Sequence, residues 1–147
     1  MGNQLMSYKA ALNMKPVLVY ITLSADSVLA NGDPVAFDTV TGSSSHGVTI
    51  SNSVITVPSG YQWFCQAQII SNTVVAANID WYLNGSVATV FAESGIATNT
   101  GASITSNVIG HCAVDAISSS ANIELRSDAA FTVESDFSFM LLIGYPS

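Results

Sequence analysis

Residues 51–71, SNSVITVPSGYQWFCQAQIIS, decide the fold of this chain. Two runs of apolar and β-branched residues flank Pro58, Ser59 and Gly60, which are residue types typical of a turn. After the turn, apolar and polar side chains alternate. One face would hold Tyr61, Trp63, Cys65, Ala67 and Ile69, and the other Gln62, Phe64, Gln66 and Gln68. Alternation of period two predicts an antiparallel strand with one buried face.

The same pattern recurs along the chain, with Gly, Asn, Ser or Pro between the apolar segments. Strands are expected over 15–25, 34–40, 61–71, 72–86, 87–94, 107–117, 121–128 and 130–146, with a strand pair or a bulged strand over 48–57. Residues 26–34 read as a turn, and Asn84-Gly85 as a type I′ hairpin turn. We therefore expect an all-β, antiparallel sandwich or jelly roll over residues 16–147. Residues 1–15 differ in composition and are expected to form an N-terminal arm.

The last predicted strand is apolar on both faces. Phe137, Phe139, Leu141 and Ile143 share one face, while Met140 and Leu142 lie on the other. Both faces of such a strand must be shielded from water. Either the sandwich covers both faces, or a neighbouring subunit covers one of them. We favour a neighbouring subunit because few charged residues are present to keep the surface solvated.

Charge is scarce and unevenly placed. Only 9% of the residues are charged, against about 25% in a typical soluble domain, and the formal net charge is −7. Lys9 and Lys15 lie in the arm, and Arg126 is the only basic residue after them. Binding to nucleic acid or to an anionic membrane surface needs clustered Lys and Arg, so neither is expected. The N-terminal segment lacks the apolar core of a secretory signal, so cytoplasmic synthesis is expected.

Metal and cofactor chemistry are not expected. The chain has two cysteines, Cys65 and Cys112, and two histidines, His46 and His111. A closed zinc site has four ligands in closely spaced pairs, whereas the two histidines are far apart in the sequence. Neighbouring residues on a strand point to opposite faces, so His111 and Cys112 are poorly placed for joint ligation. Buried free thiols are the expected state of the two cysteines, and a disulfide between them is the alternative.

No catalytic constellation stands out in the sequence. Ser44, Ser45 and His46 lie in a Gly- and Ser-rich loop without the features of a nucleophile elbow. His111 reads as a strand histidine. The turns at 31–33 and 127–128, with Asp33 and Asp128, are the candidates for a calcium site. Two carboxylates from distant strands remain the alternative that would make the chain a glycoside hydrolase.

The order of the motifs resembles the globular C1q and tumour-necrosis-factor-like jelly roll. The segments that carry the resemblance are PVAFDTV, ITVPSGYQWFCQAQI, IDWYLNGS, ANIELRSD and FSFMLLIGYP, spread over residues 16–146. The resemblance implies a homotrimer in which the closing strand and its neighbours face the threefold axis. It also implies that Phe137, Phe139, Leu141 and Ile143 form the trimer interface.

The family includes viral head fibres and capsid decoration proteins. The lack of a secretory signal and of a disulfide pattern in this sequence favours the viral kind. We expect a homotrimeric capsid decoration or cement protein of a bacteriophage, bound to the major capsid protein on the virion surface. The arm, with Lys9 and Lys15, is expected to contact the capsid. A receptor- or glycan-binding knob of a spike or tail fibre is the alternative, with a host-surface glycan as partner. A secreted ligand of the C1q or cytokine type is a third possibility.

Overall fold

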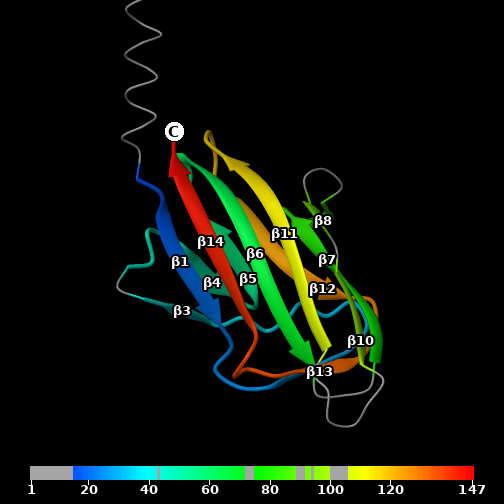
Figure 1. Cartoon of the computed structure of the whole chain (residues 1–147). Coiled ribbons are helices and arrows are strands. Elements are labelled where there is room, and N and C mark those ends of the chain that lie inside the picture. Colours follow the sequence, from blue (N-terminus) through cyan, green and yellow to red (C-terminus); the bar gives the residue numbers. More distant parts are fainter. Residues whose placement is uncertain (1–14, 43, 72–74, 89–91, 94, 100–105) are drawn as a thin grey trace, which may run out of the picture.

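Two antiparallel β-sheets stack face to face in this protein (Figure 1). The computed structural model describes residues 15–42, 44–71, 75–88, 92–93, 95–99 and 106–147. Within these ranges, no helix is long and apolar enough to cross a membrane. The antiparallel sandwich expected from the sequence is confirmed.

The front sheet, sheet A, contains the longest strands. Its strands in spatial order are β3 (Thr39–Thr41), β1 (Val17–Thr22), β14 (Phe139–Pro146), β6 (Tyr61–Ser71), β11 (Ser106–Ala116) and β9 (Ala92–Glu93). Two short strands, β13 (Phe131–Val133) and β2 (Ser27–Leu29), continue the sheet from the last residue of β6. The end of sheet A where β6 begins and β14 ends is called the upper end, as in Figure 1.

The second sheet, sheet B, covers the back of sheet A. Its order is β10 (Gly95–Asn99), β7 (Val75–Leu83), β12 (Ala121–Ser127), β5 (Val54–Val57) and β4 (Thr49–Ser51), and β8 (Ser86–Val87) pairs with β7. The segment expected to be a strand pair or a bulged strand is a hairpin. Asn52 and Ser53 form its turn, both with positive φ, between β4 and β5.

The core lies between the two sheets and follows from the alternation in the sequence. One row across sheet A joins Val19, Leu142, Cys65 and Cys112 in register, and all four are fully buried. Trp63 of β6 and Trp81 of β7 are the largest buried side chains. Because alternate residues of each strand point inward, each sheet contributes one apolar face to this core.

The turn at residues 58–60 anchors the upper end of the sandwich. Gly60 has a φ of 91°, which is unstrained only for glycine, and its N–H donates to the carbonyl of Ala116 at 2.9 Å. The Trp63 indole N–H donates to the carbonyl of Pro58 at 3.4 Å. The turn at residues 58–60 therefore joins the start of β6 to the end of β11.

The hairpin turn at Asn84-Gly85 is confirmed. Asn84 has a φ of 51° and Gly85 a φ of 82°, as a type I′ turn requires. The turn joins β7 to β8, and the side-chain oxygen of Asn84 also accepts a hydrogen bond from the N–H of Asn122.

One strand prediction and one turn prediction were wrong. The segment 34–40 forms only an isolated bridge between Pro34 and Arg126 before β3 begins, while β2 lies inside the segment expected to be a turn. Val35 and Phe37 of this segment are buried, so its apolar residues fill the core from an extended connection rather than from a ladder.

The expected strand over 130–146 is divided into β13 and β14. Between them Ser138 is buried, and its hydroxyl accepts a hydrogen bond from the N–H of Ile70 at 2.9 Å. Phe137 therefore lies in the turn before β14 and not on the strand with Phe139. Polar side chains that bond the backbone of β6 at this point compete with continuation of the ladder.

Candidate interaction surface

Apolar and aromatic side chains gather on the face of sheet A that points away from sheet B, which we call the outer face. Leu18 and Tyr20 of β1 are 50% and 46% exposed, and Tyr145 of β14 is 48% exposed. Phe64 of β6 is also exposed. Contiguous exposed apolar surface is typical of a protein–protein interface.

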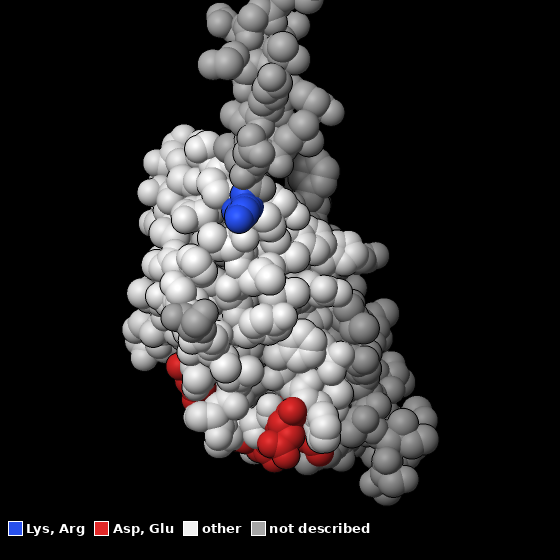
Figure 2. Space-filling view, turned by 60° about the vertical axis from the view of Figure 1, so that its left-hand side comes forward, with Lys and Arg blue, Asp and Glu red and all other residues white. Residues whose placement is uncertain are grey.

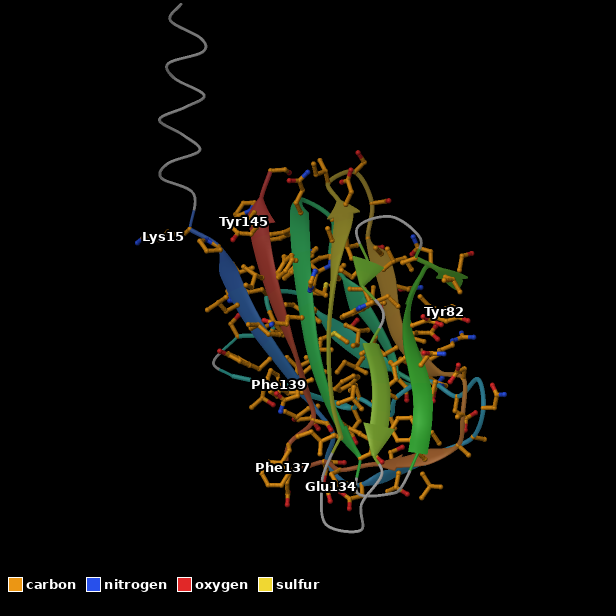
Figure 3. The ribbon with its side chains drawn as sticks, turned by 45° about the vertical axis from the view of Figure 1, so that its right-hand side comes forward. Lys15, Tyr82, Glu134, Phe137, Phe139 and Tyr145 are labelled. Atoms are coloured by element: carbon orange, nitrogen blue, oxygen red, sulfur yellow. The ribbon has the colours of Figure 1, made fainter. Side chains whose placement is uncertain are left out.

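Three of the four predicted interface residues lie on this face. Phe139, Leu141 and Ile143 alternate along β14 with the buried Met140 and Leu142, and all three are partly buried. The strand is therefore apolar on both faces, as expected. Phe137 is displaced from this row to the turn at the lower end of the sheet, where it is exposed (Figure 3).

Glutamines interleave with these apolar residues along β6. Gln62 and Gln66 are exposed, whereas the amide of Gln68 donates to the carbonyl of Phe137 at 2.9 Å. Phe64 stacks on the imidazole of His111 from β11, with ring centroids 5.9 Å apart. His111 is thus on the outer face while Cys112 is inside, as the strand alternation predicted.

A groove of about 460 Å³ opens at the upper end of the outer face. The side chains of Gln62, Phe64, Ala113, Asp115 and Tyr145 line it, and Trp63 and Val114 also contribute to its lining. Tyr145, Gln62 and Asp115 are in register across β14, β6 and β11, so one row of the sheet forms its upper rim.

Charged side chains are sparse on and around the outer face. Figure 2 shows basic atoms at the upper end and acidic atoms at the lower end, with uncharged surface between them. Lys15 is exposed at the start of β1, whereas Lys9 lies outside the described residues. Contact of these lysines with a capsid stays a prediction.

The outer face of sheet B has a different chemistry. Arg126 Nε donates a hydrogen bond to Glu124 Oε2 at 2.7 Å, and Arg126 Nη2 lies 2.6 Å from the same oxygen. The same guanidinium lies 4.5 Å from the centroid of the Tyr82 ring. Arg126 is thereby held by residues of its own chain, and its guanidinium stabilises the buried carboxylate of Glu124.

The two candidate calcium turns meet, but their carboxylates bond to the protein itself. The N–H of Gly32 donates to the carbonyl of Ser127 at 2.7 Å. Asp33 accepts from the N–H of Ala30 at 2.8 Å, and Asp128 accepts from the N–H and the amide of Asn78 at 2.7 and 2.6 Å. In the described ranges no three His, Cys, Asp or Glu side chains are grouped as metal ligands would be.

Other carboxylates also fix loops. Asp26 accepts from the N–H and hydroxyl of Ser135, and these hydrogen bonds lower the pKa of Asp26. Hydrogen bonds from Ser24 and Thr39 likewise lower the pKa of Asp38. Ionised, hydrogen-bonded carboxylates of this kind are typical of structural turns.

The Ser44–His46 segment is an exposed loop between β3 and β4. The Ser44 hydroxyl oxygen accepts from the N–H of His46 at 3.2 Å, and His46 has a φ of 48°. The hydroxyl thus closes a local turn of the loop.

Cys65 and Cys112 are free thiols, both fully buried, as expected. They face each other in register across β6 and β11. Burial raises the pKa of Cys65 well above its ordinary value, and the neighbouring Cys112 raises it further. Burial also raises the pKa of Cys112, to about 11.

The sequence reading missed several residues of the outer face. Leu18, Tyr20 and Tyr145 were not identified, and Phe64 was assigned only to a solvated polar face. The signal was present in β1, because VLVYIT is apolar on both faces in the same way as the closing strand. Asp115 was unremarkable in sequence, since only its neighbours across β6 and β14 place it at a groove.

No family model matches the chain, and no curated protein matches it in sequence. Solved structures do match its fold. Eiger TNF from S. frugiperda has a TM-score of 0.65 at 10% identity, over 87% of this chain and 91% of that one. Murine APRIL at pH 5.0 has a TM-score of 0.62 at 10% identity, over 88% of this chain and 98% of that one.

These matches show a tumour-necrosis-factor-like jelly roll. The expected fold is therefore confirmed over most of the chain. The matches do not distinguish the viral kind from others, because identity near 10% carries information on fold alone.

Proposed function

We propose that this chain is a non-catalytic structural protein that assembles as a homotrimer through the outer face of sheet A. The observation that supports the proposal is the apolar row Phe139, Leu141 and Ile143, flanked by the exposed Leu18 and Tyr20 on β1. Water contact with such a face is unfavourable, and a second copy would remove it. The sparse charge around the row lowers the desolvation cost of burying it.

The trimer is the assembly that the resemblance to the C1q and tumour-necrosis-factor-like family implies. A rotation axis along the strands would place three outer faces around a common centre, with the closing strand near it. Three copies joined in this way form a closed ring with no unused copy of the interface.

The trimer's role, in our proposal, is to decorate a viral capsid. The protein body is acidic and would not bind packaged nucleic acid. Lys15 lies where the N-terminal arm joins the jelly roll. The arm that precedes it would contact the major capsid protein, and several such contacts per trimer would cement neighbouring capsomers.

A receptor- or glycan-binding knob is the second candidate. The observation in its favour is the outer face of sheet B, where Tyr82 and Arg126 present an aromatic ring and a cation that remain partly exposed. Aromatic rings beside polar groups are common where proteins bind partners.

The solution mass tests the assembly. Light scattering over a dilution series should give about 46 kDa, three times the 15.3 kDa chain, at all but the lowest concentrations. A monomer at every concentration would contradict the proposal at its first step.

The copy number per virus particle separates the two roles. Quantitative mass spectrometry of purified particles should find the chain in numbers comparable to the major capsid protein if it decorates the shell. A few copies per particle would indicate a knob, and its absence from particles would rule out both.

A further inference from the structure

Lys15 and Asp115 lie at the same end of sheet A but on opposite sides of it. Val17, Gly144, Trp63 and Val114 form one row across β1, β14, β6 and β11. Asp115 is one residue above this row, and Lys15 precedes Val17 by two residues at the upper end of β1. Their heights along the strands therefore differ by about 3.4 Å, the rise of one residue.

The two charges cannot pair within one chain. Three strand spacings separate β1 from β11, and at about 4.8 Å each this amounts to roughly 14 Å. Asp115 Oδ1 accepts from the N–H of Ile117 at 3.1 Å, a local turn contact. Among the described residues no basic side chain forms an ion pair with Asp115, and Lys15 projects away from the sheet beyond β1 (Figure 3).

The groove beside Asp115 suits a lysine side chain. Phe64, Ala113 and Tyr145 offer apolar surface to an aliphatic stem, while the Asp115 carboxylate and the Gln62 amide stand at the rim. Lysine commonly lays its methylenes along apolar surface and keeps its ammonium at a polar edge. Asp115 is also the one acid whose described side chain lines this groove.

Self-assembly would bring the two sides together. A rotation axis that runs along the strands keeps upper ends at the same height and sets the β1 side of one copy against the β11 side of the next. We propose that Lys15 of one copy enters the groove of a second copy and pairs with its Asp115. The groove is then a site that only the neighbour completes. This inference rests on the proposed assembly through the outer face.

Charge reversal tests the pair. Lys15→Glu and Asp115→Lys each replace an attraction between copies by a repulsion, and like charges set against each other across an interface weaken it strongly. Each variant should raise the concentration at which half the protein dissociates by about tenfold or more at low ionic strength. The double variant, Lys15→Glu with Asp115→Lys, should restore the dissociation concentration to within about threefold of the wild type.

The control pairs Lys15→Glu with a reversal elsewhere. Asp136 is exposed in the turn at the lower end of the sheet, so Lys15→Glu with Asp136→Lys has the same net charge as the double variant. This control should remain as weak as Lys15→Glu alone. Circular dichroism and urea unfolding of every variant would show that the jelly roll is intact.

The outcomes separate the pair from the assembly. A wild-type monomer would overturn the assembly and the pair together. If the wild type is an oligomer but the double variant dissociates at least as readily as the single variants, the pair is overturned and the assembly stands. High salt should reduce the difference between the single variants and the wild type, because it screens a pair at the rim of an interface.

Discussion

Gly144 is a residue whose identity the packing explains. It is buried in β14, and a Cβ built there would lie 2.7 Å from Cζ3 and 2.8 Å from Cη2 of Trp63. The indole ring occupies the space that any other side chain would need. Gly144 therefore lets the largest core residue of β6 pack directly against the backbone of β14.

Replacing Gly144 should destabilise the fold through this contact. Gly144→Ala is expected to lower the free energy of unfolding by about 1–3 kcal/mol, because the indole must move within a close-packed core. Urea denaturation followed by Trp fluorescence would measure the loss.

The matched control is the same change in a Trp63→Phe background. Phenylalanine lacks the outer indole atoms that the new methyl group meets, so the alanine should cost less there. An equal loss in both backgrounds would mean that strain in β14 itself, rather than the Trp63 ring, explains the glycine.

This contact could not have been predicted from the sequence. Alternation alone placed Trp63 on the buried face, and that prediction is confirmed. The choice of Gly at 144 depends on which residue lies opposite it, and Trp63 and Gly144 become neighbours only through the pairing of β6 with β14. Long-range register is invisible to a local pattern.

At the scale of elements, β6 and β11 form the longest strand pair of sheet A, and each contributes one buried thiol. Cys65 and Cys112 are opposite each other and face the core between the sheets. Because both thiols have a raised pKa in the folded protein, the folded state holds protons that the unfolded state releases in alkaline solution. Stability should therefore fall as the pH rises from about 8.5, where unfolded thiols ionise.

The decline should depend on the cysteines themselves. Urea denaturation at several pH values up to that of the Cys112 pKa, about 11, would measure the slope. Cys112→Val keeps a similar apolar volume but cannot ionise, so its slope should be smaller than that of the wild type. Equal slopes in the two proteins would show that other groups cause the alkaline loss.

The elements themselves were predicted unevenly. Strands β6, β7, β12 and β14 were predicted because apolar residues recur at every second position along each of them. The segment 34–40 was read as a strand because Val35 and Phe37 are spaced by two, but they are buried from an extended connection beside β12. Alternation reports burial of a face, and a segment can have that without a full ladder.

The whole molecule is a sandwich with two chemically different outer faces. Sheet A presents apolar and aromatic side chains, whereas exposed residues of sheet B include Thr49, Ser51, Asn78 and Asn122. The sequence predicted the apolar row on β14, but it could not identify the groove, because Gln62, Asp115 and Tyr145 come from three strands that only the fold aligns. The asymmetry of the two faces makes opposite predictions for substitutions on each.

A charge in the middle of the outer face should separate the subunits without unfolding them. Leu141 lies in register with Tyr20 on one side and Gln66 on the other, and it is partly exposed in the single chain. Leu141→Glu can keep its carboxylate in water as a monomer, but assembly would bury that charge without a partner. Light scattering should therefore give a mass near 15.3 kDa with an unchanged circular dichroism spectrum.

The same substitution on sheet B provides the control. Thr49 is exposed on β4, and Thr49→Glu adds the same charge to a face that is already polar. Its mass should remain that of the wild type. If Leu141→Glu stayed assembled while Thr49→Glu dissociated, the interface would lie on sheet B. The apolar row of β14 would then need another partner, because an uncovered apolar face of this kind is costly in water wherever the subunits meet.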